Sequence, residues 1–245
     1  MPKRNIFFET LRPYHIFSRA VDKKEIFGAE DDCLRFLFQT YAANIGKIGF
    51  NLTKKQITDT ANALLAGREF NDSNFIKGHP PLVYVLSFVL VVDHYHFLLV
   101  SETESGIPAY MQKLNNGFAK YFNLKNDRRG ILFESRYKIV PVKSDFQLNA
   151  VLRYINIINP LDVYQPGWRQ RGLENREKAL EFLNRYQFSS FPDLFGARKS
   201  AILAPARIIK EYLGEGAVEN RVDNLRFVED FLKEKSTVSN PLFLE

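Results

Sequence analysis

Several residue types are scarce in this 245-residue chain, and each scarcity excludes a class of protein. Cys33 is the single cysteine, so no disulfide can form within the chain, and a reducing compartment is expected. The N-terminal segment lacks the apolar core and small-residue cleavage site of a signal peptide. The one long apolar stretch, from Val83 to Val100, is interrupted by Asp93 and two histidines, which are costly in the middle of a bilayer. We therefore expect a soluble cytoplasmic protein with no membrane partner.

Acidic residues are scarce in one part of the chain. Residues 111–153 hold nine Lys or Arg against three Asp or Glu, a net charge of +6 that equals the net charge of the whole chain. A charge excess concentrated in one segment is typical of a surface that binds nucleic acid. A solvated helical surface has the same composition, so the charge pattern leaves both interpretations open.

Apolar and aromatic patterns predict strands and helices that alternate over residues 10–160, and from residue 161 a more polar, helical chain. The expected strands are Tyr14–Val21, Ser87–Val92, His94–Val100 and Ile131–Val142. The expected helices are Ala29–Ala43, Lys54–Phe70 (partly irregular), Ile107–Phe122, Ser144–Ile158, Leu173–Tyr186, Pro205–Leu213 and Val222–Lys233. This order predicts an α+β fold with helices on one face of the sheet. We expect a core at residues 1–160 and a helical C-terminal extension at residues 161–245.

Histidine is also scarce, and two of the four histidines stand in the stretch DHYHFLLV, residues 93–100. Positions i and i+2 of a strand share one face, so His94 and His96 point the same way and can hold one metal ion. Two histidines that only form hydrogen bonds on a half-polar sheet face would give the same sequence pattern, so this interpretation also stays open. Position 98 is Leu98, which argues against a nucleotide-hydrolase histidine triad, and the lack of a downstream His/Cys cluster argues against structural zinc.

Five segments together resemble one family. The stretch SFVLVVDHYHFLLVSE resembles the strand–turn–strand of the HUH single-strand DNA transposases, in particular their REP-associated tyrosine transposase branch, which belongs to the small insertion-sequence transposases. YHIFSRAVDKKEIFGAEDDCLRFL (14–37) is similar to the first strand and helix of that family, and residues 111–142 to its basic helix–turn–strand. FQLNAVLRYINIINPLDV (146–163) is similar to its tyrosine helix, and QFSSFPDLFG (187–196) to a later Ser-Ser-aromatic segment. The resemblance covers roughly residues 8–200 and implies the antiparallel ferredoxin/RRM-like sheet of an HUH endonuclease core.

The resemblance implies a transposase and endonuclease that cleaves and rejoins single-stranded, hairpin-associated DNA. Tyr154 is then the nucleophile that forms a 5′-phosphotyrosine, and His94 and His96 hold a divalent metal, Mg²⁺ or Mn²⁺. A phenol ionises near pH 10 and needs activation, but phenolate is a good leaving group, so the step is reversible. The implied partner is single-stranded or hairpin DNA, bound by a monomer or homodimer.

The family usually carries a polar residue four positions after the tyrosine, and this position is Ile158 here. Asn159, which precedes Pro160 as in the family, lies one residue further on. In a regular α-helix Asn159 would lie about 140° around the axis from Tyr154. A π-bulge absorbs one inserted residue, so we predict a distorted turn between Tyr154 and Pro160. Asn159 is then the third metal ligand, and Asn156 is the second choice.

Basic residues around this predicted site are expected to contact DNA phosphates. They are Arg19, Lys23, Lys113, Lys120, Arg128, Arg129, Arg136 and Lys138. Tyr121, Phe122 and Trp168 are candidates for stacking on bases. Two alternatives remain: a domesticated protein that binds DNA hairpins with weak or no cleavage, and a metal-dependent small-molecule hydrolase. The localised basic segment argues against the hydrolase.

Overall fold

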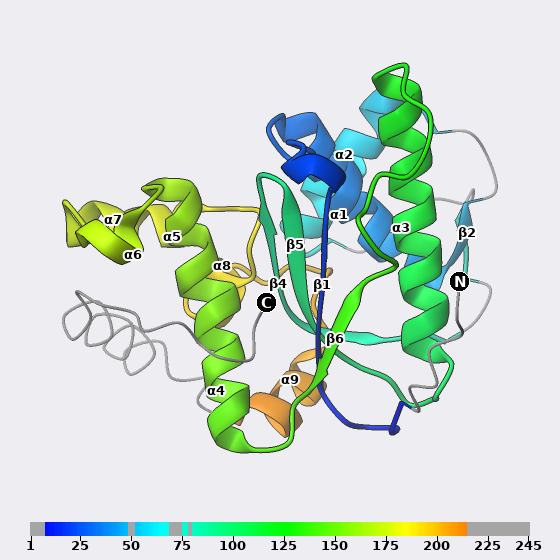
Figure 1. Cartoon of the computed structure of the whole chain (residues 1–245). Coiled ribbons are helices and arrows are strands. Elements are labelled where there is room, and N and C mark those ends of the chain that lie inside the picture. The colour runs from blue at the N-terminus through cyan, green and yellow to red at the C-terminus, as the bar shows by residue number, and fades with distance from the viewer. Residues whose placement is uncertain (1–7, 49–51, 69–74, 78–79, 215–245) are drawn as a thin grey trace.

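The structure is a computed structural model, and it describes residues 8–48, 52–68, 75–77 and 80–214 (Figure 1). Its main sheet has four antiparallel strands in the order β4 (Tyr84–Val91), β5 (His94–Val100), β1 (Tyr14–Arg19) and β6 (Lys138–Pro141). With α1 after β1 and α3 after β5, the chain follows the ferredoxin-like order βαββαβ. The predicted α+β class and antiparallel sheet are therefore confirmed.

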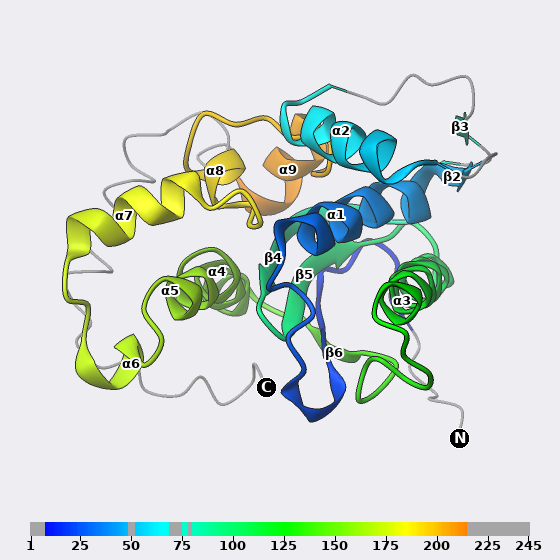
Figure 2. The same ribbon diagram turned by 90° about the horizontal axis from the view of Figure 1, so that it is seen from above.

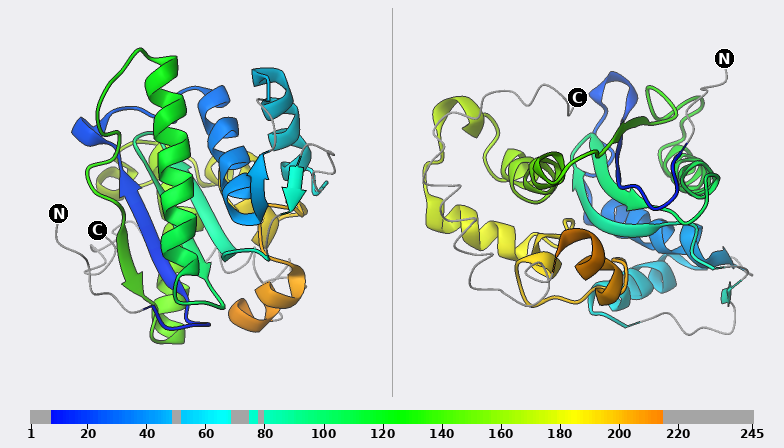
Figure 3. Two further views of the ribbon diagram at one scale, coloured as in Figure 1. Left: turned by 90° about the vertical axis from the view of Figure 1, so that its right-hand side faces the viewer. Right: turned by 90° about the horizontal axis from the view of Figure 1, so that it is seen from below.

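Helices α1 (Glu30–Ile45) and α3 (Gly106–Lys125) cover one face of the sheet (Figure 2). Alternate residues of a strand point to opposite faces, and Tyr95 and Phe97 of β5 point to this one. The Phe36 ring of α1 lies 4.9 Å from the Tyr95 ring and 5.0 Å from the Phe118 ring of α3, so aromatic contacts join both helices to the strand. In Figure 3, α3 crosses this face of the sheet.

A small insertion separates α1 from β4. It contains β2 (Gly46–Ile48), α2 (Lys54–Leu65) and β3 (Phe75–Lys77), and β2 pairs with β3 in a separate two-stranded sheet. Thr53 and Gln56 form a reciprocal capping box at the start of α2, in which Thr53 Oγ1 accepts from Gln56 N and Gln56 Oε1 accepts from Thr53 N. The predicted irregular stretch to Phe70 therefore contains a regular helix that ends at Leu65.

The second face of the sheet is also covered by helices, so the prediction of helices on one face is wrong. The helix α4 (Asp145–Arg153), the π-helix η2 (Tyr154–Ile158) and α5 (Asn159–Tyr164) lie on this side (Figure 2). Every residue of β5 is buried, and Leu98 and Val100 point away from α1 and α3. A central strand that is apolar on both faces needs a covering layer on both sides.

The predicted strand Ile131–Val142 is shorter than expected, because β6 begins only at Lys138. Its partner β1 ends at Arg19, and the chain beyond turns into a single 3₁₀ turn, η1 (Val21–Lys23). Residues 131–137 instead make isolated contacts: Glu134 N donates to Arg19 O (3.0 Å), and Arg136 O accepts from Asn115 Nδ2 (2.8 Å). Beyond the pair Phe17–Lys138, contacts such as the bridge between Ala20 and Phe133 replace a continuous ladder, so the regular strand begins only at Lys138.

Four further helices follow α5: α6 (Trp168–Arg171), α7 (Arg176–Arg185), α8 (Phe191–Leu194) and α9 (Ala206–Leu213). They confirm the expected helical character of residues 161–214, and they share a core with α4, α5 and the strands β4 and β5. The division at residue 160 stays a prediction, and the helix predicted at Val222–Lys233 lies outside the described residues. Among the described residues, no helix has the length and apolar composition that a bilayer crossing requires.

Candidate nuclease site

The histidine pair lies on the sheet face that α4 and η2 cover. Strand register pairs Phe17 with His96 and Arg19 with His94, so these four side chains share one face with His15. His94 is 9% exposed and His96 is 1% exposed, which places His94 at the rim and His96 in the interior. Their ring centroids are 5.0 Å apart, as expected for two residues on one side of a strand.

A third histidine, His15, completes this cluster. His15 is fully buried, and its Nε2 lies 2.9 Å from His96 Nδ1, a hydrogen-bond distance. Burial lowers the pKa of His15 to about 3. Burial, the larger cause, together with electrostatic interactions with His15, His94, Arg19 and Arg169 also lowers the pKa of His96 well below its usual value. Both rings are therefore neutral at physiological pH, and the pair shares one hydrogen-bonded proton.

The outer nitrogens of this pair, His96 Nε2 and His15 Nδ1, are buried and have no hydrogen-bond partner among the described residues. Each neutral ring carries one N–H. If His15 donates to His96, the His96 Nε2 carries a proton with no acceptor. If His96 donates to His15, the His96 Nε2 presents a lone pair. That second arrangement is the form that binds a metal ion.

His94 is oriented by a carboxylate instead. Its Nδ1 lies 2.5 Å from Asp93 Oδ1, and Asp93 Oδ2 lies 3.6 Å from Arg19 Nε. Partial burial works to raise the pKa of Asp93, but the hydrogen bond with His94 and the charges of His94 and Arg19 outweigh it, so the pKa lies below its usual value. The Asp93 carboxylate is thus hydrogen-bonded to His94 Nδ1, and His94 Nε2 is the nitrogen that can bind a metal ion.

Tyr154 faces the histidines from the covering helix. Its ring lies 5.2 Å from the His96 ring and 6.1 Å from the His15 ring, edge-on to both. Tyr154 is 1% exposed, so its surroundings are almost wholly protein. The structure therefore brings the predicted nucleophile beside the predicted metal ligand His96, although the two residues are far apart in the sequence.

The chain between Tyr154 and Pro160 is distorted as predicted. Residues Tyr154–Ile158 form a π-helix, and the Asn159 N–H bonds to the Tyr154 carbonyl five residues earlier. Asn159 Nδ2 donates to the same carbonyl (2.8 Å), which brings its side chain back toward Tyr154. This geometry leaves the Asn159 amide oxygen for another partner, and its assignment as a metal ligand stays a prediction.

Asn156 has a different set of partners. Its Nδ2 donates to Ser87 Oγ and to Leu152 O, both at 2.9 Å, and its Oδ1 accepts from Ser190 Oγ at 2.7 Å. Ser190 also accepts from Phe88 N, so the Ser-Ser segment ties the π-helix to the edge strand β4. Because its oxygen already accepts a hydrogen bond, Asn156 is the poorer candidate ligand of the two asparagines.

Arg169 of α6, held by Asp162 of α5, completes the surroundings of Tyr154. The guanidinium carbon of Arg169 lies 5.7 Å from the Tyr154 ring centroid, and Arg169 forms an ion pair with Asp162. Sequence patterns did not single out Arg169 or Asp162, because their contacts depend on a turn that folds α6 back toward α4. His15 had a usable signal, since it alternates with Phe17 and Arg19 along a predicted strand and so shares one face with them.

A cavity of about 30 Å³ lies beside His94 and His96, with Arg19 and Lys138 among its lining residues. This space suits an ion or a water molecule. Among the described residues, no cluster of three or more His, Cys, Asp or Glu side chains is arranged as a metal site. The donors present fit a divalent ion through two imidazoles, with the other ligands supplied by amide, water or substrate oxygens.

The predicted DNA-binding residues fall into two groups. Arg19 and Lys138 line the cavity, and the Lys138 ammonium lies 5.5 Å from the Phe17 ring. Lys113 and Lys120 lie on exposed positions of α3, which packs on the opposite face of the sheet. The others border the turns near the ends of β1 and α3; they are Lys23, Arg128, Arg129 and Arg136. A DNA-binding role stays a prediction for all eight.

Two of the three candidates for base stacking are buried in the core. Phe122 is 5% exposed and Trp168 is 2% exposed, so neither ring offers a free face. Trp168 donates from Nε1 to Asp162 Oδ1 at 2.9 Å, which fixes the start of α6. Tyr121 is half-buried and donates to Asp32 Oδ1 at 2.8 Å. The aromatic richness of these segments therefore serves packing at Phe122 and Trp168.

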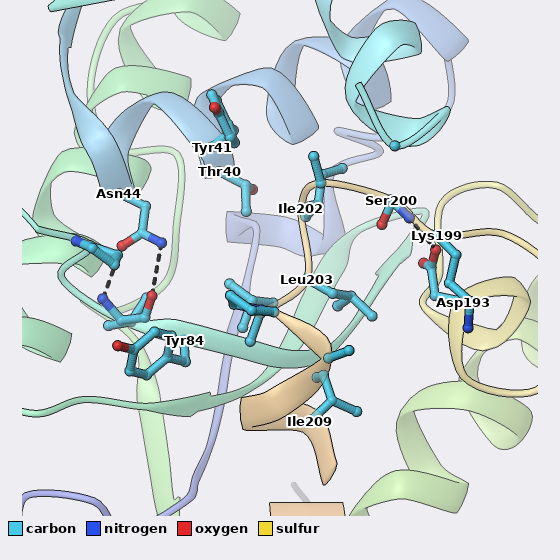
Figure 4. Close-up of a pocket in the computed structure, with 18 of the residues that line it drawn as sticks. Thr40, Tyr41, Asn44, Tyr84, Asp193, Lys199, Ser200, Ile202, Leu203 and Ile209 are labelled. Atoms are coloured by element: carbon cyan, nitrogen blue, oxygen red, sulfur yellow. Dashed lines mark hydrogen bonds between the residues drawn. The ribbon is translucent and has the colours of Figure 1, made fainter. Parts of the chain in front are cut away.

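A much larger cavity, of about 650 Å³, lies away from the histidines between α1, the start of β4 and the loop before α9 (Figure 4). Its walls are mostly apolar, and its polar groups are largely engaged. Asn44, for example, makes two hydrogen bonds to the Val83 backbone. The cavity contains neither Tyr154 nor a histidine, so it is separate from the candidate nuclease site.

The fold therefore places two histidines of one strand beside a tyrosine of a covering helix. Residues 82–157 match the model of the family described as "Transposase IS200 like", and this match contains His94, His96 and Tyr154. The resemblance drawn from the sequence is therefore confirmed for this segment. No curated protein matches the chain.

One solved structure with a similar chain is titled "Structure of the REP associates tyrosine transposase bound to a REP hairpin". The two chains share 11% sequence identity with a TM-score of 0.47, and the alignment covers 79% of this chain and 85% of that chain. The bound hairpin is a property of that protein.

Proposed function

We propose that this protein cleaves and rejoins single-stranded, hairpin-associated DNA through a 5′-phosphotyrosine on Tyr154. The observation that carries the proposal is the edge-on contact between Tyr154 and His96, 5.2 Å between ring centroids, within the segment that matches the IS200-like transposases. A tyrosine beside a neutral histidine whose outer nitrogen has no partner among the described residues supports such chemistry, because the nucleophile and a possible metal ligand then lie together.

In the proposed reaction the Tyr154 oxygen attacks a DNA phosphorus and the P–O3′ bond breaks. The phenol gives up its proton, and the departing 3′ oxygen takes one up, so the products are a phosphotyrosine ester and a free 3′-OH. The reverse reaction uses a 3′-OH as the nucleophile and phenolate as the leaving group. Because an ester bond is conserved in each step, the strand can be rejoined without an external energy source.

Each residue of the site has a defined part in this proposal. His94 and His96 would hold Mg²⁺ or Mn²⁺ through their Nε2 atoms, and Asn159 would contribute its amide oxygen. When bound, the ion supplies charge that stabilises the anionic phosphorane. Asp93 orients His94, and Lys138 and Arg19 supply positive charge where the DNA backbone reaches the site.

Hairpin binding without cleavage is the second candidate, and one observation favours it. Tyr154 is 1% exposed, so a phosphodiester reaches its oxygen only if the covering layer moves. The hydrolase alternative is weaker, because the cavity beside the histidines is about 30 Å³ whereas ligand pockets measure roughly 300–1,000 Å³.

The test is incubation with a single-stranded DNA hairpin labelled at either end, in the presence of Mn²⁺. We expect an adduct that resists denaturing gel electrophoresis and carries the 3′ label, while the 5′ label leaves on a fragment that ends in a 3′-OH. Tyr154→Phe should abolish the adduct and retain hairpin binding. Tyr164→Phe, which changes a half-buried tyrosine of α5, is the matched control and should retain both.

The outcomes separate the candidates. Binding by the unaltered protein without an adduct supports the hairpin-binding alternative. An adduct that persists in Tyr154→Phe contradicts the assignment of the nucleophile, and a label at the opposite end of the DNA contradicts the proposed polarity.

A further inference from the structure

The turn that follows α3 carries two exposed aliphatic side chains, one at each end. Leu124, in the last turn of α3, is 75% exposed, and Ile131, which follows Gly130, is 68% exposed. Three of the five exposed large apolar side chains among the described residues lie at this end of the sheet, since Val92 stands in the turn between β4 and β5. Exposed apolar side chains that gather in one place are typical of an interaction surface.

Asn123 and Arg128 hold this turn in one conformation. Asn123 Nδ2 donates to Gly130 O at 2.9 Å, and Asn123 Oδ1 accepts from Arg128 Nη1 at 2.7 Å. The backbone N–H of Arg128 donates to Asn123 O at 2.8 Å. Gly130 has φ 93°, a conformation that glycine adopts because it has no Cβ. Because these bonds join the two ends of the turn, Leu124 and Ile131 are held near each other.

The turn is also positively charged. Residues 123–131 contain Lys125, Arg128 and Arg129 against Asp127, a net charge of +2. Lys125 forms an ion pair with Asp32 at 2.6 Å, and the Arg128 guanidinium is bonded within the turn. Arg129 is exposed and has no partner among the described residues. Two aliphatic side chains beside a free guanidinium complement a nucleic acid, which offers apolar base faces next to phosphate charge.

The chain leads directly from this turn to the candidate nuclease site. Leu132 O accepts from Val21 N at 3.0 Å, which ties the segment to the end of β1. Two residues further on, Glu134 lines the cavity beside the histidine pair. Three residues span at most about 11 Å of chain, so Ile131 lies within that distance of Glu134. In Figure 1 the end of α3 and the start of β5 lie at the same end of the sheet.

We propose that Leu124 and Ile131 stack on the last base pair at the open end of a DNA hairpin stem, with Arg129 on a neighbouring phosphate. The inference rests on the proposed function and names the part of the hairpin that lies beside the site. Aliphatic side chains enter the interior of a duplex only after its base pairs unstack. The last pair of a stem has one free face already, so two side chains can cover it without that cost. The single strand that leaves the stem there then follows residues 131–135 toward the cavity.

The test uses a DNA hairpin with a single-stranded tail and 2-aminopurine in the last base pair of the stem, and every protein carries Tyr154→Phe so that no strand is cut. The matched control is Phe146→Ser, since Phe146 is exposed but begins α4 after β6 has reached the opposite end of the sheet. We expect Leu124→Ser combined with Ile131→Ser to weaken hairpin binding about tenfold and to remove the fluorescence change. Binding of the tail alone should be unaffected. Both positions are exposed, so the fold should be retained.

Arg129→Gln separates charge from stacking. It should lower the log–log salt slope of hairpin binding by about 0.9 and keep the fluorescence change, whereas the double serine variant should keep the slope. Phe146→Ser should match the parent protein in both readouts.

Unchanged hairpin affinity in the folded double variant overturns the inference, and so does an equal loss in Phe146→Ser. A changed oligomeric state with unchanged hairpin affinity would assign the surface to a contact between copies of the chain. If the protein with Tyr154 intact forms no adduct while the double variant loses hairpin affinity, the cleavage proposal fails and the stem contact stands. If an adduct forms and the fluorescence does not respond, the stem contact fails and the cleavage proposal stands.

Discussion

The hydrogen bond between His15 and His96 predicts that His15 controls metal affinity without binding the metal. A metal on His96 Nε2 requires the proton on Nδ1, and the acceptor for that proton is His15 Nε2, 2.9 Å away in a buried site. In His15→Phe the acceptor is replaced by a ring of similar size. The free protein can then move the His96 proton to Nε2, but metal binding forces it back to Nδ1 with no acceptor. Loss of such an outer partner costs about 10- to 100-fold in affinity.

The assay measures Mn²⁺ affinity by titration, with binding monitored by calorimetry or by the electron paramagnetic resonance signal of the free ion. His15→Gln is the rescue variant, because its amide oxygen can accept the His96 proton, and it should bind within a few-fold of the unaltered protein. Phe17→Leu is the packing control, since the Phe17 ring stacks on His96 at 5.2 Å but offers no acceptor. Equal affinity in folded His15→Phe and the unaltered protein would refute the reasoning. A loss as large in Phe17→Leu would show that packing is responsible.

Three further predictions follow from other contacts. Asn156→Leu removes three side-chain hydrogen bonds, two of them buried, so the free energy of unfolding should fall by about 1–3 kcal/mol in urea denaturation. An unchanged midpoint would contradict the role of this network. Burial raises the pKa of Cys33 to about 12, so the thiol should resist Ellman's reagent at pH 8 until the protein unfolds. Because that pKa is raised, the contribution of Cys33 to the free energy of unfolding is complete below pH 9 and declines by about 1.4 kcal/mol per pH unit above pH 9. Cys33→Ala should lack this decline. Lys138→Gln should lower the salt dependence of single-stranded DNA binding by about 0.7 in log–log slope, whereas Lys55→Gln, at an exposed position of α2, should leave it unchanged. Equal effects would exclude the cavity as the DNA contact.

The histidine site shows what strand periodicity can predict and what it cannot. The i, i+2 rule puts His94 and His96 on one face from the sequence alone, and the register of β5 agrees. The same rule applied to Tyr14–Arg19 would have placed His15 on one face of β1. It could not show which strand lies beside β5, because strand order depends on contacts between distant segments. Thus His15 became a partner of His96 only in the folded sheet.

The helix that carries Tyr154 also has one feature that the sequence predicts and others that only the folded chain decides. An extra residue before Pro160 predicted a distorted turn, and the π-helix Tyr154–Ile158 confirms it. The hydrogen-bond partners of the two nearby asparagines could not be predicted, because they come from other parts of the chain. Asn156 is engaged by Ser87 and Ser190, and Asn159 bonds to the Tyr154 carbonyl.

The sequence by itself determined the class of fold, the positions of most helices and strands, and the two residue types that face each other in the site. These features depend on local periodicity, on the fixed φ of proline and on apolar patterns that read the same in any context. Only the tertiary structure decided that helices cover both faces of the sheet, that β6 is short, and that Arg169 reaches Tyr154. Those outcomes depend on which distant surfaces meet, since the apolar burial that drives folding is non-directional and leaves the pairing to the shapes of the whole chain.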